Sequence, residues 1–148
     1  MTKGELAKEY FEKGYNCAQS VALAFKDEMG LDETTVAKLA SSFGGGVARM
    51  REICGAVSGG AFVIGMLKGY SDPKATVEKT EHYKRVREFI ANFQEECGSH
   101  ICSELLQGVQ HTDGAVPEKR TEGYYKKRPC GELCLISANV VEKTLKGD

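Results

Sequence analysis

Cysteines are the residues with the greatest chemical potential in this 148-residue chain, which contains six of them. Capping residues and apolar periodicity place Cys17, Cys54, Cys102 and Cys130 at or near the first turns of four separate helices. A helix N-terminus carries unpaired N–H groups and a partial positive charge, which favour thiolate and lower a thiol pKa. The sequence therefore predicts four thiols that act as nucleophiles or ligands.

Two further cysteines are auxiliary candidates. Cys97 is expected near the end of a helix, where the dipole raises the thiol pKa, and Cys134 lies one turn after Cys130 on the same face. Free cysteine is also among the most buried residue types and behaves as a small hydrophobe. Packing without chemistry therefore remains an alternative for every cysteine.

Glycines surround Cys54 in residues 43–65, FGGGVARMREICGAVSGGAFVIG. Gly44, Gly45 and Gly46 predict a loop without side chains, and Gly55 opens a small and apolar segment that predicts a buried helix. Glycine inside a helix costs roughly 1 kcal/mol against alanine, so another helix or a cofactor is expected to approach this surface closely. These four glycines are candidate cofactor-contacting positions.

The elements that must position these residues are all predicted to be helices. Asn16 and Asp32 are N-cap residues, Ser71-Asp72-Pro73 predicts the start of a long helix, and Gly98 its end. No segment alternates like a strand, and residues 109–128 predict a loop that could cover a site. We expect an all-α fold, a single domain over residues 1–148 built as a bundle of about six helices. The expected helices are 5–12, 16–29, 32–43, 55–67, 73–97, 99–106 and one that opens at Pro129, and the expected core face of the long helix is Val77, Tyr83, Val86, Phe89, Ile90 and Phe93.

Composition excludes several function classes. The net charge is −1 and the sequence pI about 6.3, which gives no electrostatic case for binding nucleic acid or an anionic membrane. No apolar run reaches the ~18 residues of a membrane-spanning helix, so membrane insertion is not expected. The N-terminal residues are charged where a signal peptide would be apolar, and the cysteine content is low for a disulfide scaffold. We expect a cytoplasmic protein in a reducing compartment.

Five segments resemble a known family when they are taken in order. They are GYNCAQSV at 14–21, FGGG at 43–46, CGAVSG at 54–59, GSHICSEL at 98–105 and the cysteine that opens the last helix. Together they resemble the C_GCAxxG_C_C family of redox-active proteins over nearly the whole chain. The resemblance implies four shared cysteines, which map onto Cys17, Cys54, Cys102 and Cys130, and it implies no particular substrate.

Three hypotheses for function follow. The first is thiol–disulfide or electron-transfer chemistry with an unidentified redox partner or small ligand, although the chain has no CxxC pair. The second is a metal site, for zinc or an iron–sulfur cluster, formed by the same four cysteines. The third is a helical protein, including a homo-oligomer, whose cysteines only pack. The cofactor stays open, and haem is disfavoured because no CxxCH is present and His82, His100 and His111 are expected at the surface.

One geometric expectation separates these hypotheses. The four cysteines should cluster in space around helix starts, with at least one pair, most simply one that includes Cys54, within disulfide reach. Arg49 and Arg51 precede Cys54 and could hold a thiolate or an anionic ligand near it, although such residues more often belong to a solvated loop.

Overall fold

The computed structural model describes residues 1–147, and within that range the chain is all-α. It contains nine α-helices and one short 3-10 helix, η1, and its single β-type contact is an isolated bridge between Ile53 and Ile101. The predicted all-α class is confirmed. The helices exceed six because several are short. Their bounds are α1 Lys3–Glu12, α2 Cys17–Leu23, α3 Lys26–Met29, α4 Glu33–Ala40, η1 Ser41–Phe43, α5 Gly55–Lys68, α6 Thr76–Cys97, α7 Cys102–Leu105, α8 Glu122–Lys127 and α9 Cys130–Lys146.

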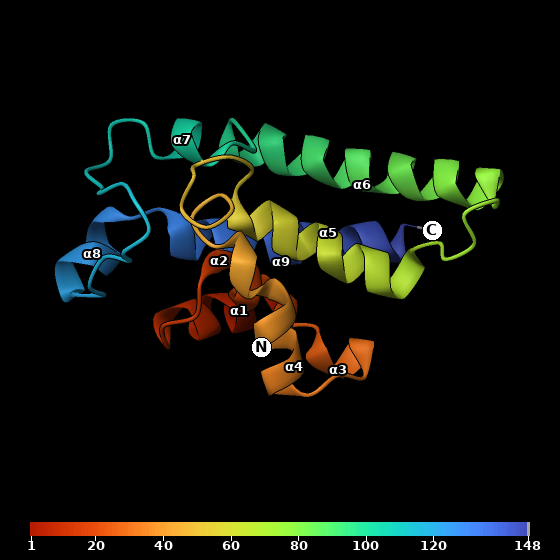
Figure 1. Cartoon of the computed structure of the whole chain (residues 1–148), viewed down its shortest axis with the longest axis horizontal. Coiled ribbons are helices and arrows are strands. Elements are labelled where there is room, and N and C mark those ends of the chain that lie inside the picture. Colours follow the sequence, from red (N-terminus) through yellow and green to blue (C-terminus); the bar gives the residue numbers. More distant parts are fainter. Residues whose placement is uncertain (148) are drawn as a thin grey trace.

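The centre of the molecule is α5, the glycine-rich helix that was expected to be buried. It packs against α2, α9 and α6, while α1 lies on α9 and α2 (Figure 1). Its buried residues are Gly55, Ala56, Val57, Gly59, Gly60, Val63 and Ile64. A helix that is apolar nearly all round is stable only when other helices enclose it, and here three of them do so.

Local signals placed most helix ends correctly. The Asn16 side chain accepts a hydrogen bond from the Gln19 N–H, and Gln19 reciprocates in a capping box that starts α2. Asp32 caps α4, and α6 ends at Gly98 with a positive φ. The segment expected as one helix over 16–29 is interrupted at Phe25 and continues as the short α3.

The long helix differs from the prediction at its start. Asp72 forms a local turn, because its side chain accepts a hydrogen bond from the Lys74 N–H and its carbonyl accepts one from the Ala75 N–H. Helix α6 therefore begins at Thr76 and not at Pro73. Its first turns extend past the bundle, so Val77 and Tyr83 are exposed, which corrects their expected place in the core. Phe89 and Phe93 are fully buried as predicted, and Val86 and Ile90 are partly buried.

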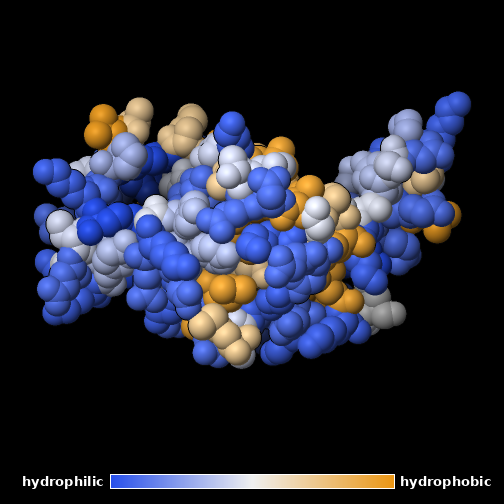
Figure 2. All heavy atoms as spheres, turned by 90° about the horizontal axis from the view of Figure 1, so that it is seen from below, coloured by the Kyte–Doolittle hydropathy of each residue, from blue (hydrophilic) through white to orange (hydrophobic). Residues whose placement is uncertain are grey.

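None of the helices in residues 1–147 combines the length and hydrophobicity that crossing a membrane requires. On the face drawn in Figure 2, hydrophilic side chains predominate and hydrophobic ones lie between them in small separate groups.

Candidate functional site

The four predicted cysteines all lie at helix starts. Cys17, Cys102 and Cys130 are the first residues of α2, α7 and α9, and Cys54 is the N-cap residue of α5. Their positions on the helices were therefore read correctly from local sequence. Only the position of Cys102 within its helix differs from the prediction. Helix α7 begins at Cys102 and not at Ser99, whose hydroxyl instead accepts a hydrogen bond from the Ile101 N–H.

One cavity of about 320 Å³ brings these helix starts together. All four cysteines line it, and so do the four glycines singled out in the sequence, Gly44, Gly45, Gly46 and Gly55. The remaining lining residues are Phe11, Asn16, Ser41, Ala48, Arg49, Arg51, Leu105, Leu106, Ala115, Pro117, Glu118, Arg120, Tyr124, Arg128 and Leu133. The expected convergence of the cysteines is thus present in the structure.

Within the cavity, the Cys17 and Cys130 side chains are near enough for each to shift the pKa of the other. The Cys134 thiol also interacts with the Cys17 side chain, and it donates to the Cys17 carbonyl oxygen at 3.8 Å. Cys54 and Cys102 are near enough to Cys130 to interact with it through charge. Cys17 therefore interacts with Cys130 and Cys134 directly, whereas Cys54 interacts with other cysteines through charge.

Burial reverses the expected effect of the helix N-termini on the thiols. It raises the pKa of Cys54 to about 12, although the Ala56 and Val57 N–H groups at the start of α5 act to lower it. Burial also raises the pKa of Cys102, against the lowering effect of Arg51. These thiols are protonated at neutral pH, so the prediction of lowered pKa values is wrong.

The thiols of Cys17 and Cys130 follow the same rule. Interaction with Cys17, together with burial, raises the pKa of Cys130. Interaction with Cys130 lowers the pKa of Cys17, but interaction with Cys134 and complete burial outweigh this effect and raise the pKa well above that of an ordinary thiol. The desolvated cavity wall outweighs the helix dipoles, whose effect falls off within one turn.

The glycine loop is a left-handed turn, which the sequence did not predict. Residues 45–49 all have positive φ, and Val47, Ala48 and Arg49 do so without being glycine. Hydrogen bonds from the Arg49 N–H to the Gly44 carbonyl and from the Glu52 N–H to the Gly46 carbonyl close the turn. A non-glycine residue in this conformation costs roughly 1–2 kcal/mol, so the rest of the fold must hold the turn in place.

Close approach explains two of the glycines at the cavity. A Cβ on Gly46 would lie 2.7 Å from the Cys102 Cβ, and one on Gly55 would lie 3.2 Å from the Cys17 Cβ. Both distances are shorter than ordinary contacts between carbon atoms. A side chain at either position would push a cysteine out of the cavity wall.

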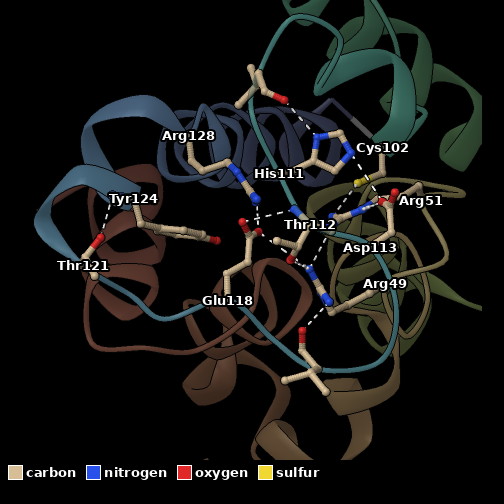
Figure 3. A network of polar contacts seen from close by, with 12 residues as sticks. Arg49, Arg51, Cys102, His111, Thr112, Asp113, Glu118, Thr121, Tyr124 and Arg128 are labelled. Atoms are coloured by element: carbon tan, nitrogen blue, oxygen red, sulfur yellow. Dashed lines mark hydrogen bonds and ion pairs between the residues drawn. The ribbon is translucent and has the colours of Figure 1, made fainter.

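The left-handed turn directs two arginines at residues 109–121, which we call the lid segment (Figure 3). Arg49 donates hydrogen bonds to the Gly114 and Val116 carbonyls and, at 2.9 Å, to the Thr112 carbonyl. Arg51 donates to the same Thr112 carbonyl at 2.8 Å and to the Cys102 sulfur at 3.7 Å. The loop expected to cover a site is therefore tied over the cavity by these side chains.

The other end of the lid segment brings residues that sequence reasoning missed. Glu118 pairs with Arg128 and lies 3.7 Å from Arg49, while Arg120 donates to the Phe11 and Tyr15 carbonyls at 3.0 Å. Arg128 also lowers the pKa of the nearby Cys130 thiol and lies over the Tyr124 ring. These residues occur in a polar stretch without periodicity, and the pair of tyrosines before α9 was the one local signal that a cavity wall is built there.

A shared metal site is not favoured by this arrangement. Within residues 1–147, no group of three or more histidine, cysteine, aspartate or glutamate side chains is placed to hold a metal ion. His82, His100 and His111 do not line the cavity, and neither does Cys97, whose pKa is raised to about 11 mainly by burial. Cys17, Cys54, Cys102 and Cys130 thus share a cavity without forming a preorganised ligand set.

Comparison with known proteins gives one match. The chain matches the family described as "Putative redox-active protein (C_GCAxxG_C_C)" over residues 15–144. No curated protein and no solved structure matches it. Because the match covers nearly the whole chain, the protein belongs to the C_GCAxxG_C_C family.

Proposed function

We propose that this member of the C_GCAxxG_C_C family carries out thiol–disulfide exchange, with Cys17 and Cys130 as the pair that is oxidised to a disulfide and reduced again. The observation that carries the proposal is the position of these two cysteines in the wall of one cavity, near enough for each to shift the pKa of the other. Formation of the bond removes two protons and two electrons, which pass to an acceptor disulfide and convert it into two thiols.

The two cysteines have different roles in this proposal. Cys130 is half-buried whereas Cys17 is buried, so Cys130 is the thiol that an incoming molecule meets first. The Cys17 side chain and burial raise the pKa of Cys130, and the positive charge of Arg128 lowers it and so favours the thiolate. Cys130 therefore attacks and forms a mixed disulfide, and Cys17 then attacks the Cys130 sulfur and releases the second thiol.

The remaining cavity cysteines support this pair. The Cys134 thiol donates to the Cys17 carbonyl oxygen from the same helix face as Cys130 and so holds Cys17 close to this face of α9. Cys54 and Cys102 line the same cavity and are candidates for the transfer of oxidation equivalents to a second partner. Their partner stays unidentified.

Disulfide mapping tests the proposal. Reduced protein is equilibrated in thiol–disulfide buffers, free thiols are trapped with a maleimide in acid, and peptides are analysed by mass spectrometry. We expect one reversible intramolecular disulfide that joins Cys17 to Cys130. It should be abolished by Cys130→Ser and kept by the matched control Cys97→Ser, which lies outside the cavity.

Two results would contradict the proposal. One is a Cys17 or Cys130 thiol that stays free in buffers in which other cysteines of the chain oxidise. The other is stoichiometric zinc or iron in anaerobically purified protein, with all thiols recovered after chelation, which would assign the four cysteines to a metal site instead.

A further inference from the structure

The cavity has an excess of positive charge. Four arginines line it, Arg49, Arg51, Arg120 and Arg128, and within residues 1–147 the one carboxylate in its wall is Glu118. Glu118 is shared between Arg128 and Arg49. Asp113 lies 3.9 Å from Arg51, but its side chain is 81% exposed, so solvent screens that pair.

Most partners of these arginines are neutral. Arg120 donates to backbone carbonyls of Phe11 and Tyr15, and Arg49 and Arg51 donate to carbonyls of the lid segment. Carbonyl groups satisfy N–H donors without cancelling a full charge. Among residues 1–147, the buried Nε of Arg51 has no hydrogen-bond partner, and the Asp113 carboxylate lies 3.9 Å from it. The lining of the cavity therefore contains both uncompensated charge and a donor without a hydrogen bond.

Two long helices add to this field. α5 and α9 begin at the cavity, and neither has a side chain that caps its first N–H groups. α2 is different, because Asn16 and Gln19 cap it fully. Uncapped N-termini carry a partial positive charge and favour an anion in front of them.

The rest of the cavity wall is apolar. Phe11, Leu105, Leu106 and Leu133 contribute to it, together with the face of Tyr124. A volume of about 320 Å³ lies at the lower end of the range for small-molecule sites and is large for an inorganic anion. The wall thus fits an organic molecule with an apolar middle and acidic ends.

From this combination of charge, shape and thiols we propose that the cavity binds a small organic disulfide that carries carboxylate groups, and that this anion is the exchange partner of Cys130 and Cys17. The inference rests on the proposed function. The carboxylates occupy the arginines, which sets the disulfide against the apolar wall beside Cys130. Cys130 loses its proton as its sulfur attacks the disulfide, which forms a mixed disulfide and expels one thiolate, and the expelled thiolate takes up that proton. Attack by Cys17 on the Cys130 sulfur expels the second. Two protein thiols are oxidised and one substrate disulfide is reduced.

Three disulfides of similar size and different charge test the inference. Dithiodipropionate is a dianion, hydroxyethyl disulfide is neutral and cystamine is a dication. We expect the dianion to oxidise the Cys17–Cys130 pair at least about tenfold faster than the dication at low salt, with a smaller ratio at high salt. The ratio should also fall towards one in Arg51→Gln and stay unchanged in Arg87→Gln, which removes an exposed arginine on α6.

A redox-inert probe separates failure of the inference from failure of the proposed function. Suberate has the length and charge of dithiodipropionate without its sulfurs, and calorimetry with the Cys130→Ser protein measures its binding directly. Suberate binding that is lost in Arg51→Gln supports the anionic site even if no disulfide oxidises the cysteines, a result that would overturn the exchange chemistry. Equal oxidation rates for the three disulfides, with no suberate binding, would overturn the inference and leave the exchange chemistry intact.

Discussion

The contact between α2 and α5 gives a quantitative prediction at Gly59. A Cβ added there would lie 2.5 Å from the Ala18 carbonyl oxygen, whereas ordinary contact begins near 3.4 Å. The obstacle is backbone, which cannot rotate away, so one helix must move. Overpacking of this kind costs about 1–3 kcal/mol, and alanine returns at most about 1 kcal/mol through its higher helix propensity. We expect Gly59→Ala to lower the free energy of unfolding by about 1–2 kcal/mol and Gly59→Leu by more than about 2.

Gly65 provides the matched control in the same helix. A Cβ at Gly65 would meet nothing within 4 Å. Gly65→Ala should therefore change the free energy of unfolding only through the higher helix propensity of alanine, and raise it by about 0.5–1 kcal/mol. The difference between the two alanine variants isolates the steric effect at Ala18. For a chain of this length, 1 kcal/mol corresponds to roughly 2–4 °C in Tm.

Urea unfolding followed by circular dichroism at the helix band measures both variants, with the slope checked for constancy. Ala18 directly follows Cys17, so Gly59→Ala should also slow formation of the Cys17–Cys130 disulfide, whereas Gly65→Ala should not. The reasoning is refuted if Gly59→Ala lies within 0.5 kcal/mol of the wild type or behaves like Gly65→Ala.

Two further predictions concern the cavity. Burial holds the pKa of Cys54 at about 12, against 9.0 for an unperturbed cysteine, so the buried thiol contributes stability that is present below about pH 9 and lost as the pH rises towards 12. Urea titrations at increasing pH should show this decline, to which Cys54 contributes up to about 4 kcal/mol for a full shift, and Cys54→Ala should make it shallower, with the other buried thiols accounting for the rest; an equally steep decline in that variant would contradict the assignment. Glu118→Gln leaves Arg49 and Arg128 without their shared carboxylate, so trypsin should cleave at Lys119 and Arg120 faster, while Glu122→Gln, which removes an exposed carboxylate of α8, should leave cleavage unchanged. Equal cleavage of the two variants would show that Glu118 does not hold the lid segment.

Local chemistry explains which parts of the fold were predictable. Asn16, Asp32 and Gly98 act on the backbone within a few residues, so their sequence signals fixed helix ends and with them the helix positions of the cysteines. The predicted start of α6 at Pro73 was wrong because the turn at Asp72 also uses local hydrogen bonds and competes with the helix. Propensity alone does not decide between two local structures of similar stability.

The errors at the site have a tertiary origin. Lowered thiol pKa values were predicted from the positions of the cysteines at helix starts. Burial, which depends on residues far away in sequence, has the larger effect and raises the pKa of Cys54 and Cys102. The roles of Glu118 and Arg128 depend on the lid segment folding back over α9, which no periodicity indicates. Val47 and Ala48 give no sign of positive φ, because neither residue favours it.

Backbone pairing shows why the cysteines from α5 and α7 face one another. The Cys54 N–H donates to the His100 carbonyl at 2.8 Å and the Cys102 N–H donates to the Glu52 carbonyl at 2.6 Å, so each helix start is fixed by the segment that precedes the other. In the core, the Ser137 hydroxyl donates to the Ala56 carbonyl at 2.7 Å and joins α9 to α5 two residues after Cys54. The convergence is therefore built by hydrogen bonds outside the thiols and does not require a disulfide.

Glu118 is the residue that compensates part of the positive charge around the cavity. Positive helix ends and four arginines surround a cavity whose thiols are protonated at neutral pH, so the cysteines cannot supply the negative charge that was expected of them. Glu118 supplies part of it from the lid segment, through Arg49 and Arg128. An anion that binds these arginines competes with Glu118 for them. The proposed anionic substrate that reaches Cys130 would therefore also weaken the attachment of the lid segment. Binding of the substrate and release of Glu118 from the arginines are then coupled steps.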